Sequence, residues 1–212
     1  MKSIKNDGAA RCPNNCEPFE VEYWSLISAD QNPDLKEAAL GGELNLVQCP
    51  ECGTFFHHDG DLIYFDAPAE MLIFVFSEKD RKKEPELIKR MQEDYGIIKN
   101  TLLKQLNMDY PPLYVFGLEG LKNILQEEEK IVFESEAVAA SAAEQGFRVV
   151  RLKPSYARQH HFPYYVPAAT GGEANDYAIA AAKVLKGGVK SPLLANFKDR
   201  MSEEGAQSPL LL

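Results

Sequence analysis

Apolar and polar residues alternate with a period of two along much of the first third of the chain. In residues 19–28, Phe19, Val21 and Tyr23 share one face, and glutamates occupy the other. This alternation predicts a half-buried strand. Four further short apolar runs follow, at residues 43–48, 53–58, 61–67 and 71–76. Turn signals between the later runs, such as Asp59-Gly60, predict hairpins and therefore a small antiparallel sheet.

Helices are expected on the flanks of this sheet. Pro33 is a helix-start signal and Gly41-Gly42 a helix-stop signal, which together predict a short helix over residues 33–40. Residues 84–107 place apolar side chains near helical spacing with charges between them, the pattern of an amphipathic helix. One more strand and one more helix are expected before residue 130.

The character of the sequence changes near residue 131. Alanine-rich stretches at 134–146 and 176–188 and a final segment at 191–205 predict helices, with one short strand after the first. Residues 155–175, rich in Tyr, Pro and Gly, predict a long loop. We therefore expect an α+β protein of two domains, the sheet domain over 1–130 and a helix-rich C-terminal region with a long loop over 131–212.

Charge and hydropathy narrow the classes of partner. The net charge of −9 disfavours a nucleic-acid binder, because phosphate contacts need clustered Lys and Arg. No apolar stretch reaches the roughly 18 residues of a membrane span. The N-terminal segment carries no apolar core of a secretory signal, so we expect a cytoplasmic protein with reduced thiols.

The candidate chemistry lies in the four cysteines. Cys12 and Cys16 form C-x3-C, Cys49 and Cys52 form C-x2-C after 32 intervening residues, and no cysteine is left over. In a reducing compartment such spacing favours metal binding over disulfides. Four thiolates can surround one ion tetrahedrally at about 2.3 Å. The spacing therefore predicts a structural zinc site with all four cysteines as ligands.

Two other uses of these thiols stay open. Iron can be held by the same four thiolates, because ligand softness alone does not separate zinc from iron, although we favour zinc. A redox dithiol is the other alternative. It is disfavoured because redox C-x-x-C pairs sit at helix N-termini, whereas Cys52 leads into a predicted strand.

Two histidines follow the second cysteine pair closely. His57 or His58 could replace a cysteine as ligand, or build a second site with Asp59 and Asp61. Four thiolates already complete a tetrahedral site, and the Asp-Gly pair is typical of a plain hairpin turn. We therefore favour the turn over a ligand role.

Residues 11–130 resemble the CpXC domain family, a group of mostly bacterial proteins named for paired C-P-x-C motifs. The resemblance is carried by "CPNNC", "NPDLKEAALGGELNLVQCPECG" and "DLIYFDAPAEMLIFVF", and less clearly by "YVFGLEGLKNIL". It implies a zinc-ribbon-like metal site on the four cysteines and no particular biochemical activity. The sequence departs from the motif at its first pair, which has one extra residue.

The sequence carries no signature of a known catalytic site. It contains no G-x-S-x-G elbow, no H-E-x-x-H and no phosphate-binding loop. A catalytic zinc keeps an open coordination position, and four thiolates would close this one. We predict a non-catalytic, zinc-stabilised binding or adaptor module with a protein partner of unknown identity. The alternative is a thiol-redox protein or a rubredoxin-like iron electron carrier.

Overall fold

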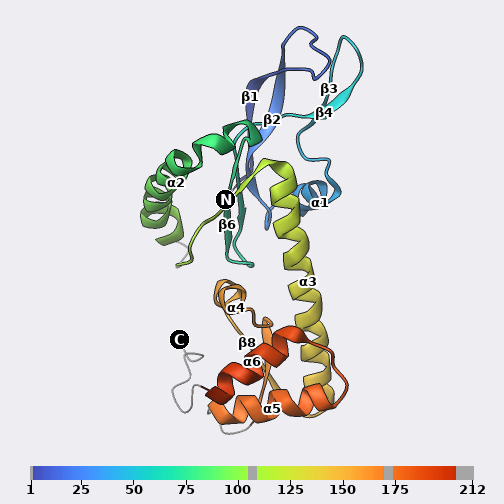
Figure 1. The fold of residues 1–212 in the computed structure, drawn as a ribbon, viewed down its shortest axis with the longest axis vertical. Helices are drawn as coiled ribbons and strands as arrows, with labels where there is room; N and C mark the ends of the chain where they lie inside the picture. The colour runs from blue at the N-terminus through green and yellow to red at the C-terminus, as the bar shows by residue number, and fades with distance from the viewer. Residues whose placement is uncertain (1, 105–108, 170–173, 204–212) are drawn as a thin grey trace. The chain divides into compact units, whose positions relative to one another are not determined.

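The computed structural model describes residues 2–104, 109–169 and 174–203. The chain divides after residue 126 into two compact units, which we call unit 1 (residues 1–126) and unit 2 (residues 127–212). Helix α3 (Gly117–Glu144) crosses this division as one continuous helix (Figure 1). The α+β class and the helical C-terminal region predicted from the sequence are both confirmed.

Helix α3 corrects one sequence expectation. The pattern predicts two helices, over residues 118–130 and 134–146, but the structure joins them. No glycine or proline lies between Leu121 and Glu144 to interrupt the helical hydrogen bonds, so the helix continues. Among the described residues, α3 and the other helices all fall short of the length and apolarity that a membrane span requires.

Unit 1 is built on a five-stranded sheet with a separate two-stranded ribbon. In spatial order the sheet strands are β1 (Ile4–Ala10), β2 (Phe19–Ser28), β5 (Leu62–Asp66), β6 (Met71–Phe76) and β7 (Leu113–Phe116). The ribbon consists of β3 (Leu46–Gln48) and β4 (Phe55–His57). β1 was not predicted, because its sequence "IKNDGAA" lies mostly exposed on the sheet edge and shows no apolar alternation.

The sheet is mixed, which corrects the expectation of a purely antiparallel one. β1–β2 and β5–β6 are antiparallel, whereas β2–β5 and β6–β7 are parallel. Parallel neighbours need a long crossover. Helix α1 (Pro33–Gly41) and the β3–β4 ribbon lie in the first crossover. The second holds the 3₁₀ segment η1 (Glu78–Lys83), helix α2 (Glu84–Ile98) and the π-helical turn η2 (Lys99–Leu103).

The expected hairpin at Asp59-Gly60 does not form. β4 pairs with β3, and β5 pairs with β2 and β6, so no ladder joins β4 to β5. Asp59 instead accepts hydrogen bonds from the Ser77 hydroxyl at 2.7 Å and from the Glu78 N–H at 3.1 Å, just after β6. These contacts hold residues 58–61 as an irregular connection between the β3–β4 ribbon and the sheet.

The core of unit 1 lies on both faces of the sheet. β6 is buried along its whole length. On one face it packs with Leu35 of α1 and with Leu121 and Leu125 of α3. On the other face it packs with Leu87 and Met91 of α2. This double burial explains the continuous apolar sequence "MLIFVF", which is typical of a strand covered on both sides.

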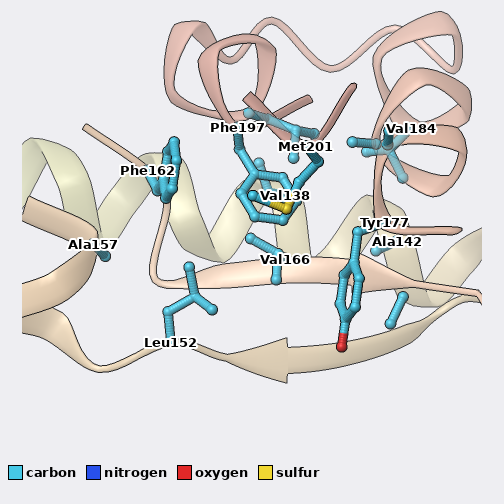
Figure 2. Close-up of a cluster of buried hydrophobic side chains, with 14 of the residues drawn as sticks. Val138, Ala142, Leu152, Ala157, Phe162, Val166, Tyr177, Val184, Phe197 and Met201 are labelled. Atoms are coloured by element: carbon cyan, nitrogen blue, oxygen red, sulfur yellow. The ribbon is translucent and has the colours of Figure 1, made fainter. Parts of the chain in front are cut away.

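Unit 2 has its own core and its own small sheet. Its elements after α3 are β8 (Arg148–Arg151), α4 (Pro154–His160), β9 (Tyr165–Ala168), α5 (Ala174–Lys186) and α6 (Pro192–Glu203). Figure 2 shows Val138 of α3, Val166 of β9, and Phe197 and Met201 of α6 gathered around one buried centre, where all four are at most 1% exposed.

Unit 2 also corrects the prediction of a long loop over residues 155–175. The first part of that stretch belongs to α4, which begins with Pro154 in its first turn. A later part forms β9, which pairs antiparallel with β8 and so satisfies its backbone groups. Residues 170–173 lie outside the described part of the chain. The Tyr and Pro content that suggested a loop instead reflects aromatic packing and short elements.

Candidate metal centre

The four cysteines meet at one end of unit 1. Cys12 and Cys16 lie in the loop that joins β1 to β2, and Cys49 and Cys52 lie in the turn that joins β3 to β4. Figure 1 draws these two connections at the same end of the unit. All four Sγ atoms lie within 4.8 Å of one another, with Cys12 and Cys52 at 3.5 Å, and all four thiols are free.

This spacing fits one metal ion. Four thiolates at about 2.3 Å from a tetrahedral zinc lie roughly 3.8 Å from each other. The observed cluster, with all four Sγ atoms within 4.8 Å of one another, is close to that size. An all-sulfur donor set suits zinc or iron. It is a poor ligand set for hard cations such as magnesium and calcium, which prefer oxygen ligands. The four cysteines can therefore hold one soft metal ion between the two loops.

The second cysteine loop has the tight turn that the sequence predicts. Gly53 adopts a positive φ of 73°, a conformation that strains side chains other than glycine. Its N–H donates to the Cys49 carbonyl at 2.9 Å, and the Cys49 N–H donates to the Thr54 carbonyl at 2.9 Å. These bonds close the turn and direct Cys49 and Cys52 toward the same point.

The first cysteine loop also makes a tight turn with a positive φ, but it does so without glycine. Asn15 adopts a positive φ of 59°, and its N–H donates to the Cys12 carbonyl at 3.1 Å. Asparagine tolerates the left-handed region better than most residues. The extra residue in this loop, which departs from C-P-x-C, is thus accommodated by one left-handed turn. The spacing of the cysteines does not reveal this role, although the paired asparagines between them are a signal of it.

The four thiols differ in their electrostatic surroundings. Burial raises the pKa of the Cys12 thiol, and hydrogen bonding with Cys52 raises that of Cys16. The exposed Cys52 behaves in the opposite way. Donation from the Thr54 hydroxyl and N–H and from the Asn14 amide lowers its pKa to about 5. Cys52 is therefore a thiolate at neutral pH, whereas Cys12 and Cys16 must lose their protons when a metal binds.

Polar groups that the sequence pattern does not predict lie beside the sulfurs. The Asn14 N–H lies 3.4 Å from Cys12 Sγ, and its side-chain amide lies 3.5 Å from Cys52 Sγ. The Thr54 hydroxyl lies 3.4 Å from the same Cys52 Sγ. Neither residue is a cysteine or a histidine, so the spacing of metal-ligating residues does not point to them.

His57 and His58 are engaged in other contacts. His57 Nε2 lies 2.8 Å from the Gly42 carbonyl oxygen. The His58 ring packs against Tyr23, with 4.2 Å between ring centroids. Desolvation lowers the pKa of His58, which keeps its ring neutral at neutral pH. These contacts give both histidines a packing role and favour the four cysteines as the complete ligand set.

A cavity of about 390 Å³ lies beside these histidines. Leu44, Leu118 and Leu121 supply part of its apolar wall, and His58 and Lys122 also line it. Its volume is within the range of small ligand pockets. The cavity belongs to unit 1 but contains none of the four cysteines.

The fold and the cysteine cluster define a class of protein: a small α+β domain in which two cysteine-bearing loops converge on one metal-sized position. A family model described as CpXC protein matches residues 10–135, and the chain belongs to this family. The match includes all four cysteines and ends within α3. Comparison with curated proteins and with solved structures found no match.

The histidine assignment makes a simple prediction. His58→Ala should leave the metal content of the purified protein unchanged, because its ring contacts Tyr23 and not the sulfur cluster. Metal content per chain can be measured by mass spectrometry, with Cys49→Ser as the variant that must lose metal. Loss of metal from His58→Ala would make this histidine a ligand and contradict the four-cysteine assignment.

Proposed function

We propose that this protein is a non-catalytic binding module whose unit 1 is stabilised by one zinc ion on Cys12, Cys16, Cys49 and Cys52. The observation that carries the proposal is the convergence of all four Sγ atoms within 4.8 Å. Zinc bound by four thiolates has no open position for water or substrate, so its role is structural. The role of the protein is then exerted through its surfaces.

Zinc would supply a link that the apolar core of unit 1 does not. The start of β2 and the β3–β4 ribbon also meet through Phe19 and Phe56, whose ring centroids are 6.1 Å apart. A single edge-to-face pair is worth roughly 0.5–1.5 kcal/mol beyond burial. Structural zinc binding contributes on the order of 10 kcal/mol, most of which is coupled to folding. The metal would therefore dominate the stability of this end of the unit.

The alternative is a rubredoxin-like iron centre or a thiol-redox site. Its supporting observation is the exposure of Cys52, which would bring the metal close to the protein surface. Iron bound by thiolates absorbs visible light, whereas zinc is colourless because its d shell is full. Colour therefore separates the iron centre from the zinc site.

The partner we propose is a protein with a basic surface in the cytoplasm, where thiols stay reduced. Unit 1 carries 13 Lys and Arg residues against 21 Asp and Glu residues, a net charge of 13 − 21 = −8 out of −9 for the chain. Such a field accelerates association with positively charged surfaces. The cavity beside His58 offers an additional recess for an inserted side chain.

The zinc proposal predicts a large stability loss when one ligand is removed. Cys49→Ser should lower the free energy of unfolding of unit 1 by several kcal/mol, because a three-thiolate site binds zinc much more weakly. Denaturant unfolding with and without chelator measures the effect. Chelator should bring the wild type down to the level of the variant. A variant as stable as the metal-loaded wild type would contradict the proposal.

The partner proposal predicts a dependence on both metal and salt. A partner that can be cross-linked to the intact protein at low ionic strength should no longer be cross-linked when the reaction is done in 0.5 M salt. Salt screens most of a surface attraction, because the Debye length falls from about 10 Å at 0.1 M toward 3 Å at 1 M. It should also be lost from the Cys49→Ser protein. A partner retained equally under all these conditions would contradict a metal-stabilised acidic docking unit.

A further inference from the structure

Asn14 is in contact with both halves of the cysteine cluster. Its backbone N–H lies 3.4 Å from Cys12 Sγ in its own loop. Its side-chain Nδ2 reaches across to the other loop, where it lies 3.5 Å from Cys52 Sγ and 2.9 Å from Thr54 Oγ1. These two residues are 38 and 40 positions further along the chain. Asn14 therefore joins the two loops independently of the metal.

The donors around Cys52 form a consistent chain. An asparagine amide has two N–H hydrogens, one for Cys52 Sγ and one for the Thr54 hydroxyl oxygen. The Thr54 hydroxyl keeps its own hydrogen, which can be donated to the Cys52 thiolate 3.4 Å away. As a thiolate, the Cys52 sulfur can thus accept hydrogen bonds from two side chains. This arrangement suits a thiolate, which accepts hydrogen bonds and has no hydrogen to give.

Cys52 is the cysteine that most needs these donors. It is exposed, whereas Cys12 and Cys49 are buried and Cys16 is partly buried. Four thiolates on a divalent ion leave a net charge of 2−, and hydrogen bonds to the sulfurs spread that charge. Without them that charge stays concentrated on the sulfurs, and the metal centre is less stable. Cys52 is thus the ligand at which metal loss would begin.

We propose that Asn14 is a positioning residue of the metal centre, which aligns the two cysteine loops and slows metal loss by donating hydrogen bonds to Cys12 and Cys52. The inference rests on the proposed function, because it assumes a metal on the four thiolates. This role also explains the extra residue in the first cysteine loop. Asn15 makes the left-handed turn, and Asn14 makes the contact across the cluster.

Cobalt-loaded full-length protein tests this inference directly. Sulfur-to-cobalt charge transfer absorbs in the near ultraviolet, and its energy reports electron density on the sulfurs. Asn14→Ala should move this band to longer wavelength and speed cobalt transfer to a chelator roughly tenfold or more, as loss of outer-shell partners does at other metal sites. A purely structural role in shaping the loop would change stability without moving the band.

Three further variants isolate the donor. Asn14→Asp keeps the size and turn preference of the side chain but replaces a donor with an acceptor, so metal release should be at least as fast as in Asn14→Ala. Thr54→Val removes the second donor with little change in shape and should shift the band in the same direction. Gln48→Ala is the control, because Gln48 donates to the Gly53 carbonyl at 3.2 Å and not to a sulfur; it should behave as wild type.

The outcomes separate the two proposals. Wild-type protein that binds cobalt through four thiolates, with an unshifted band and unchanged release in Asn14→Ala and Thr54→Val, would overturn the role of Asn14 and leave the zinc module standing. Wild-type protein that takes up no cobalt would overturn the zinc module, and this inference with it. A shifted band and faster release in both variants, with Gln48→Ala unchanged, supports the inference.

Discussion

The convergence of four sulfur atoms from two distant loops is the constraint on which unit 1 depends. Cys12 and Cys52 are 40 residues apart in sequence, yet their Sγ atoms lie 3.5 Å apart. Thiolates at that distance repel one another unless a cation lies between them. The loops contribute one aromatic pair and a few hydrogen bonds, which hold them weakly. A bound metal would turn this repulsion into the strongest attraction at that end of the sheet.

The local elements of the fold could be predicted where the sequence pattern itself decides them. β2, β6 and α1 follow from alternation, a continuous apolar run and a Pro-to-Gly span, respectively. The parallel pairings could not be predicted, because they depend on which crossover carries the chain back to the sheet. β1 could not be predicted either, because a mostly exposed edge strand has no alternating apolar residues. Most of the corrected predictions therefore concern how the strands pair in the folded chain, which the local sequence pattern does not determine.

The candidate site shows the same division. The four cysteines and the turn at Gly53 could be read from spacing alone, because thiolate geometry and a positive φ restrict the residue types strongly. Asn14 and Thr54 could not be assigned, since their contacts join segments 40 residues apart in the chain. The family match extends over the whole of the cysteine cluster and ends at residue 135, so most of unit 2 lies beyond it.

The most direct test of this account is native mass spectrometry of the intact protein purified without added metal, combined with a count of reactive thiols before and after chelation. The account predicts one zinc per chain, with four thiols that become reactive only after the metal is removed. A protein that carries no metal and presents four freely reactive thiols would contradict it. Iron in the same position would instead support the electron-transfer alternative.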